Sequence, residues 1–139
     1  MRHRKKTVKL GRPSAARQAL LGALARSLVR DERIVTTLAK AKAVQPLADR
    51  MISLAKKNTL AARRRAGRIL QDRRLVRKLF SEIGPRFTAR TGGYTRILKK
   101  ASGRRGDGAS MALLVYTEEG VRPVKEKKKK APAAEKAKA

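Results

Sequence analysis

The chain has 139 residues, and its 38 Lys and Arg against 10 Asp and Glu give it a formal net charge of +28. This length fits one domain with its own hydrophobic core, and so large a positive charge indicates a polyanionic partner, first of all nucleic acid and more weakly acidic lipid. The absence of Cys excludes disulfides and Cys-ligated zinc. No apolar run approaches the ~18 residues of a membrane span, and no apolar segment of the secretory type follows the basic N-terminus, so we expect a cytoplasmic protein.

Residues 1–13 are predicted to form a basic arm. Apart from His3, the only histidine in the chain, its ionisable side chains are all Lys or Arg. A segment with so little apolar content does not fold alone. The lack of acidic residues favours an arm that contacts RNA over a solvated tail.

The segment that follows the arm is predicted to hold a helix, a short strand and a second helix. The first helix begins after an N-cap at Ser14 and ends near Arg30, with a core face of Ala16, Leu20, Leu24 and Leu28. Residues 33–37 are rich in β-branched side chains and are predicted as a strand. The second helix spans 38–57, and Pro46 is expected to kink it or to divide it in two.

Two more helices are predicted in the middle of the chain. One begins after Thr59 and ends near Leu70, with arginines on its outer face. The other is capped by Asp72 and ends at Gly84 followed by Pro85, which together are a strong stop signal. Both helices carry apolar residues at helical spacing, so both are expected to pack against the core.

A β-hairpin is predicted after these helices, with strands at 94–100 and 111–116. The loop between the strands carries Arg104 and Arg105 among glycines. Two guanidiniums on a glycine-rich loop suit a bidentate grip on phosphate. Asp107 is expected to shape the turn or to orient one of the arginines.

Together these elements predict a mixed α+β fold, with about four helices packed on a small three-stranded sheet. The strand at 33–37 is too short to stand alone and is expected to join the hairpin. The predicted organisation is a basic arm at 1–13, a globular RNA-binding domain at 14–116 and a flexible tail at 117–139, which is rich in Lys, Ala, Pro and Glu.

The sequence offers little support for an enzyme. His3 has no Ser, Cys or carboxylate placed by the sequence to work with it, and the adjacent acids at 31–32 and 118–119 are interpreted as ends of secondary-structure elements. The glycine-rich loop at 102–108 lacks the Lys-Ser/Thr pair of a nucleotide-binding loop. We therefore expect no catalysis, no cofactor, no metal and no small-molecule substrate, and a small RNA-processing enzyme is the weakest alternative.

Aromatic side chains are scarce, with two Phe, two Tyr and no Trp. Phe87 and Tyr94 are candidates for base stacking, although core packing is the better interpretation of both. With so few stacking platforms, we expect recognition of folded RNA by its shape and backbone. The candidate RNA-binding residues are Arg2, His3, Arg4, Lys5, Lys6, Lys9, Arg12, Arg17, Lys40, Lys42, Arg63, Arg64, Arg96, Lys99, Lys100, Arg104 and Arg105.

Several stretches of the chain form a joint pattern. They are MRHRK at 1–5 with LGR at 10–12, IVTTLAKAK at 34–42 with Pro46 and Asp49, and GGYTRI at 92–97 with RRGD at 104–107 and Met-Ala at 111–112. Over residues 1–116 the chain resembles the bacterial large-subunit ribosomal protein L-seventeen family. The resemblance implies a mixed α/β domain that binds large-subunit ribosomal RNA without catalysis. It also implies a position on the solvent side of the subunit near the polypeptide exit region, beside other ribosomal proteins.

The sequence leaves two binding functions to compare. The first is a structural constituent of the large ribosomal subunit, which supports translation by neutralising crowded RNA phosphates. The alternative is a DNA-binding architectural protein of the nucleoid type, whose basic hairpin would embrace the minor groove. Such hairpins usually carry an apolar or proline wedge at the tip, whereas this tip has Gly, Arg and Asp, so the ribosomal function is favoured.

Overall fold

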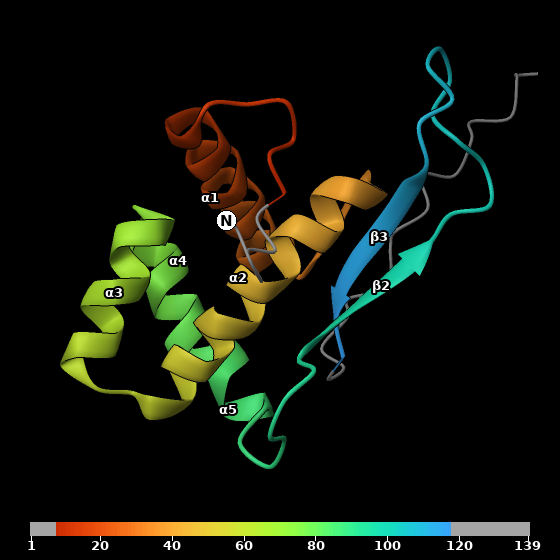
Figure 1. Cartoon of the computed structure of the whole chain (residues 1–139). Helices are drawn as coiled ribbons and strands as arrows, with labels where there is room; N and C mark the ends of the chain where they lie inside the picture. Colours follow the sequence, from red (N-terminus) through yellow and green to blue (C-terminus); the bar gives the residue numbers. More distant parts are fainter. Residues whose placement is uncertain (1–7, 118–139) are drawn as a thin grey trace, which may run out of the picture.

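One face of a three-stranded antiparallel sheet carries the helices, as Figure 1 shows for the computed structural model, which describes residues 8–117. The predicted mixed α+β fold is therefore confirmed, while residues 1–7 and 118–139, which hold most of the arm and of the tail, lie outside the described residues. The elements in chain order are α1 (Ser14–Asp31), β1 (Arg33–Thr37), α2 (Leu38–Lys57), α3 (Leu60–Leu70), α4 (Arg73–Lys78), the π-helical turn η1 (Leu79–Ile83), α5 (Gly84–Arg86), β2 (Thr95–Lys99) and β3 (Met111–Tyr116).

The sheet has the strand order β1-β3-β2, so the early strand joins the hairpin as predicted. Both pairs are antiparallel, and Ile34 and Ile97 lie opposite Leu114 from either side. The strands alternate as a half-covered sheet requires: Leu114 is fully buried beneath the helices, whereas Val35 and Leu98 on the outer face are 53% and 46% exposed.

Helix α1 differs from its prediction at its start and in its buried face. Ser14 is the first helical residue and Pro13 is the N-cap, so the prediction of Ser14 as the N-cap is wrong, and no side chain caps this end. Ala16, predicted to face the core, is exposed. The buried face instead consists of Gly22, Ala25, Leu28 and Val29. The reason is tertiary, because α1 packs against α2, α3 and β1 together.

Helix α2 runs through Pro46 as one element, so of the two outcomes expected for this proline, a kink or a division of the helix, the division is wrong. Pro46 itself is exposed. Val44 before it and Ala48 after it are both buried. Packing on both sides of the proline therefore offsets the backbone hydrogen bond that proline removes.

The predicted helix stop at Gly84 is also wrong. Gly84 is in the right-handed helical region with φ −53° and ψ −48°, and the helical path continues through α5 to Arg86. A β-carbon at Gly84 would lie 2.9 Å from the β-carbon of Ala55 in α2 and 3.2 Å from the carbonyl oxygen of Leu79. Glycine is therefore needed here for close helix packing, and it does not act as a left-handed helix terminator.

Replacing Gly84 with Ala is expected to lower the free energy of unfolding by about 1 kcal/mol. The added methyl group overpacks the contact with α2, which costs about 1–3 kcal/mol, while the higher helix propensity of Ala offsets at most about 1 kcal/mol of this cost. Gly67 in α3 is the matched control, since a β-carbon there meets no atom within 4 Å. Gly67→Ala should raise the free energy of unfolding by about 0.5–1 kcal/mol. Urea unfolding followed by circular dichroism measures both changes, and a stabilised Gly84→Ala protein would contradict the close-packing explanation.

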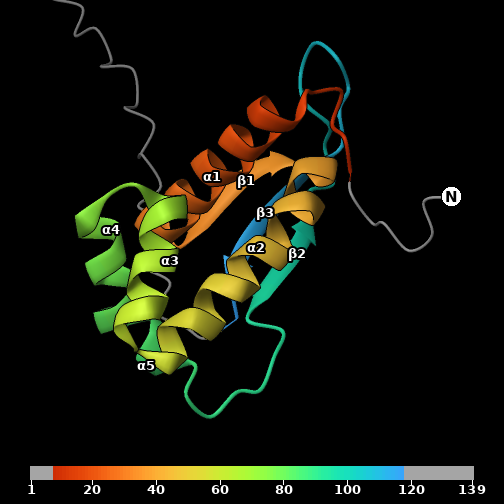
Figure 2. The same cartoon turned by 60° about the vertical axis from the view of Figure 1, so that its left-hand side comes forward.

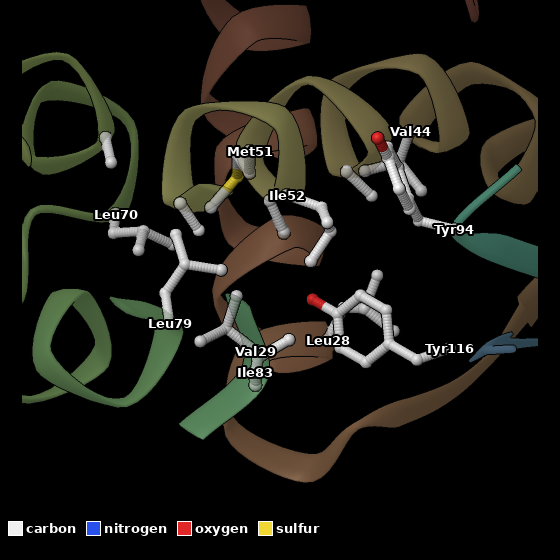
Figure 3. Packing of buried hydrophobic residues seen from close by; sticks show 14 of the residues in the cluster. Leu28, Val29, Val44, Met51, Ile52, Leu70, Leu79, Ile83, Tyr94 and Tyr116 are labelled. Carbon is white, nitrogen blue, oxygen red and sulfur yellow. The ribbon is translucent and has the colours of Figure 1, made fainter. Parts of the chain in front are cut away.

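The core lies between the sheet and the helices, and Figure 3 shows side chains from α1, α2, α3 and η1 converging with Tyr94 and Tyr116 at the sheet. Leu28, Val44, Ile52, Leu79, Ile83 and Leu114 are fully buried. Phe87 and Tyr94 are only 1% and 4% exposed. Core packing is therefore confirmed for both rings, and neither is available for stacking on RNA bases.

Candidate nucleic-acid interface

Most of the predicted RNA-binding residues that the structure describes lie on two separate surfaces. In both Figure 1 and Figure 2, the loop between β2 and β3 projects at one end of the molecule, while α3 and α4 lie at the opposite end. We call the first the hairpin-end surface, which consists of Lys40, Lys42, Lys99, Lys100, Arg104 and Arg105. We call the second the helix-pair surface, which consists of Arg63, Arg64, Arg73 and Arg77. The sequence alone did not separate these two surfaces.

The hairpin-end surface is assembled from segments far apart in the sequence. The N–H of Lys100 donates to the carbonyl of Met111 at 2.9 Å, and the N–H of Leu38 donates to the carbonyl of Ser110 at 2.9 Å. The first bond closes the base of the loop, and the second joins the loop to the start of α2. A hollow of about 710 Å³ lies at the junction, with Val8, Lys40, Lys42 and Arg104 among the residues that line it. The end of the basic arm therefore reaches the same place as the loop.

The loop tip is a closed turn whose shape depends on Asp107. The Nε of Arg104 donates to Oδ1 of Asp107 at 2.9 Å, and its guanidinium forms an ion pair with the same carboxylate. The N–H of Arg104 donates to the carbonyl of Ala109, and the N–H of Gly108 donates back to the carbonyl of Arg104, both at 3.0 Å. The hydrogen bonds from Arg104 and from the Ala109 N–H hold the pKa of Asp107 well below its usual range. The prediction that Asp107 orients an arginine is confirmed.

The two loop arginines therefore differ. Arg104 is paired with the carboxylate of Asp107. Arg105 is exposed and makes no hydrogen bond or ion pair within residues 8–117. Gly106 and Gly108, with φ of +103° and +63°, allow the tight turn that brings Asp107 back to Arg104 and leaves Arg105 outside the ion pair. Arg105 is consequently the residue of the pair whose donors are all available to an external phosphate.

The helix-pair surface depends on side-chain caps at two helix starts. Thr59 Oγ1 accepts from the N–H of Ala62 at 3.2 Å to begin α3, and Asp72 Oδ1 accepts from the N–H of Arg74 at 2.7 Å to begin α4. Gln71 links the helices in a left-handed conformation with φ 55°. The caps and this turn place the exposed arginines of both helices beside a common groove.

One arginine of this surface is held in place by two neighbours. Arg63 donates from Nη2 and Nε to Oδ1 of Asn58 at 2.9 and 3.3 Å, and its guanidinium carbon lies 5.4 Å from the centroid of the Phe80 ring. A cation over an aromatic face is attracted by the quadrupole of the ring. Arg63 is therefore oriented before any partner arrives.

Arg73 and Arg77 were missed by the sequence prediction, although they line the same hollow as Arg63. The available signal was their spacing of four residues directly after the predicted cap at Asp72, which places both on one helix face. What the sequence did not reveal was that this face lies beside α3.

The remaining predicted residues lie elsewhere. Arg96 is exposed on the outer face of the sheet, where Val115 separates it from Arg33 in the register. Arg17 is half-buried on α1, and Lys9 and Arg12 are exposed between the hairpin-end hollow and α1. Arg2, His3, Arg4, Lys5 and Lys6 lie outside the described residues.

Glu32 is occupied in holding the helices together. It accepts from Arg86 Nη1 at 2.7 Å and lies 3.3 Å from Lys78 Nζ, with its own side chain 16% exposed. Burial alone would raise the pKa of Glu32, but the hydrogen bonds and charges of Arg86 and Lys78 outweigh burial and lower it. Within residues 8–117 there is no cluster of three side chains suited to a metal ion, and no helix there is long and apolar enough to cross a membrane.

Comparison with known proteins identifies similar sequences. The family described as "Ribosomal protein L17" matches residues 20–117. The "Large ribosomal subunit protein bL17" of Methylacidiphilum infernorum is 49% identical over 128 residues, which cover 92% of this chain and 96% of that protein. The proteins of the same name from Natranaerobius thermophilus and Thermus thermophilus are 56% and 52% identical, covering 79% and 85% of this chain and 96% and 100% of those proteins.

Proposed function

Because the chain belongs to the ribosomal protein L17 family, we propose that it is a structural constituent of the large ribosomal subunit. Its role there is to bind folded large-subunit ribosomal RNA and thereby to support translation on cytoplasmic ribosomes. The family match over residues 20–117 is the observation that carries this function. The net charge of +28 agrees with a partner made of phosphates.

The mechanism is electrostatic and depends on position. The hairpin-end surface and the helix-pair surface lie at opposite ends of the fold, so one molecule can contact two separate regions of folded RNA. Each Lys or Arg that neutralises a phosphate releases bound counterions, which drives association and makes it sensitive to salt. The core fixes the distance between the two surfaces, and the phosphate contacts in turn fix the orientation of the protein.

The finer organisation follows from the same proposal. Residues 1–13 act as an RNA-contacting arm, residues 14–116 as the folded RNA-binding domain, and residues 117–139 as a tail rich in Lys, Ala, Pro and Glu. The neighbours are other large-subunit proteins near the polypeptide exit region. No catalytic step belongs to this function. The DNA-binding alternative is disfavoured, because the similar proteins are ribosomal and the loop tip carries an Arg–Asp ion pair where a minor-groove wedge would need an apolar group.

Sedimentation tests the function directly. A tagged full-length chain expressed in bacteria should travel with large subunits and should stay with them through a high-salt wash. Release from the subunits and transfer to chromosomal DNA would overturn the proposed function.

Changing both Arg104 and Arg105 to Ala is expected to weaken incorporation into large subunits about tenfold or more in competition with wild type, because two phosphate contacts are lost. Mass spectrometry of the purified subunits measures the ratio of variant to wild type. The control is Lys57→Ala with Arg65→Ala, which removes the same charge from exposed sites that do not line the hairpin-end hollow or the hollows beside α3.

The single variants then separate the two arginines of the loop. Arg105→Ala should account for most of the loss, and the melting temperature should be unchanged because its side chain has no partner within residues 8–117. If the double variant and the control variant were incorporated equally well, the loop would have no role in binding RNA.

A further inference from the structure

Three adjoining hollows cross the helical end of the molecule. The first, of about 480 Å³, lies between α3 and the α4–η1 segment and is lined by Arg77 and Phe80. The second, of about 450 Å³, shares Arg63, Arg73 and Val76 with the first. The third, of about 640 Å³, lies between α1, α2 and α3 and shares Gln71 with the second. We call this series the arginine track.

Arginine dominates the charge of the track along its whole length. The lining residues of the three hollows include Arg26, Arg50, Arg63, Arg64, Arg68, Arg73 and Arg77. Asp72 is the one acidic residue among them, and its carboxylate is occupied by the N–H of Arg74 at the start of α4. The track therefore suits a chain of negative charges.

The hollows also have apolar floors, which a surface for phosphates alone would not need. Val76 and Phe80 form the floor at one end, and Leu21, Leu47 and Ile69 form it at the other. The volumes lie within the range of roughly 300–1,000 Å³ typical of pockets that take small organic groups. A ligand that fits both the floors and the arginines has flat apolar rings joined by anionic links.

An unpaired RNA strand has this chemistry, whereas an RNA duplex does not expose it. In a duplex the bases are stacked inside and the protein meets mainly phosphates and 2′-hydroxyls, while in a single strand the bases can be splayed out onto guanidinium planes. Arg63, held by Asn58 over the Phe80 ring, offers such a plane at one end of the track. The guanidinium plane of Arg63 can therefore take the place of an exposed aromatic ring in stacking on a base.

We propose that the arginine track binds an unpaired segment of ribosomal RNA, with bases in the hollows and phosphates on the arginines between them. The proposal rests on the proposed function. It states which kind of RNA structure the helix-pair surface recognises. It adds Arg26, Arg50 and Arg68 to the RNA-binding residues of the helix-pair surface.

A matched pair of charge variants tests the phosphate contacts. Arg64→Gln with Arg73→Gln removes two track arginines, whereas Arg65→Gln with Arg74→Gln removes two exposed arginines that lie on the same helices but outside the three hollows of the track. The probe is a single-stranded oligoribonucleotide of mixed sequence and about twelve nucleotides, within the usual site size. Its affinity for the full chain should fall about tenfold with the track pair and less than about threefold with the control pair, and the log–log salt slope should shrink by roughly 1.4 with the track pair only.

A second pair tests the hollows without changing any charge. A β-carbon on Gly67 meets no atom within 4 Å, so Gly67→Leu should fill the second hollow while the helix still forms. Ala61→Leu adds a leucine to an exposed position of the same helix that lies outside the three hollows of the track. Gly67→Leu should weaken binding of the single strand about fivefold without changing its salt slope, because it blocks the stacking of a base in the second hollow. Ala61→Leu should leave the affinity unchanged.

Ultraviolet crosslinking in whole large subunits separates this inference from the proposed function. The expected result is crosslinks between residues 63–80 and unpaired nucleotides. If the chain joins the subunits but both members of each variant pair behave alike, or if the track crosslinks to paired RNA or to another protein, the inference is overturned while the proposed function stands. If the chain does not join the subunits at all, the proposed function itself fails.

Discussion

Replacing Phe87 with Ala is expected to lower the free energy of unfolding by about 3–5 kcal/mol, which is a large part of the stability of a domain this size. Phe87 is 1% exposed and contacts two other buried rings edge to face, with centroids 5.5 Å from Tyr94 and 5.9 Å from Tyr116. These rings join the segment after α5 to the start of β2 and to the end of β3. Losing Phe87 would therefore leave a cavity where the helical layer meets the sheet.

Urea unfolding of the full chain measures this loss. Leu60→Ala is the matched control, because Leu60 is large and apolar but 64% exposed, and the change should stay within about 0.5 kcal/mol. Phe87→Leu should keep most of the stability and all of the affinity for RNA. A loss of RNA binding by a folded Phe87→Leu protein would instead support the rejected interpretation of Phe87 as a base-stacking residue.

The parts of the fold that could be predicted from the sequence are those governed by local pattern. The β-branched segment at 33–37 and the apolar segment at 111–116 became strands with the predicted bounds. The predicted cap at Asp72 is confirmed, because its carboxylate accepts a hydrogen bond from the N–H of Arg74 in the first turn of α4. Such features need no information from distant residues.

The errors arise where contacts between distant elements override the local signal. Gly84 and Pro85 would end an isolated helix, but Gly84 allows close contact with Ala55, which lies 29 positions earlier in the chain (84 − 55). Pro46 interrupts a helical pattern, but buried residues on both sides keep α2 in one piece. Local propensity is a weak prior when tertiary packing opposes it.

The same distinction applies to the candidate interface. Arg104 and Arg105 were predicted because a glycine-rich loop with two arginines is recognisable in the sequence. Their unequal pairing was not predicted in detail, because it depends on the exact turn that brings Asp107 to Arg104. The helix-pair surface was predicted only on its α3 side, since its other side depends on how the turn at Gln71 folds α4 back beside α3.

Glu32→Gln is expected to lower the free energy of unfolding by about 2 kcal/mol at neutral pH, which is typical of hydrogen bonds to a charged group. Glu32 joins the end of α1 to Lys78 at the end of α4 and to Arg86 at the end of α5. Glutamine has nearly the same shape but no charge, so both cations would lose their counter-charge at sites where their side chains are only 24% and 29% exposed. Unfolding by urea measures the change, and Glu82→Gln, at an exposed glutamate of η1, should stay within about 0.5 kcal/mol.

The pH dependence of this difference identifies its cause. Because Arg86 and Lys78 lower the pKa of Glu32 below its ordinary value of 4.5, the folded state binds a proton less readily than the unfolded chain. The stabilisation by Glu32 is therefore complete above pH 4.5 and is lost as the pH falls through the lower pKa of the folded state. The gap between wild type and Glu32→Gln should narrow on acidification to about pH 3, whereas the low pKa of Asp107 is common to both proteins and cancels. A gap that stayed constant with pH would mean that the shape of the Glu32 side chain stabilises the helices and that its charge does not.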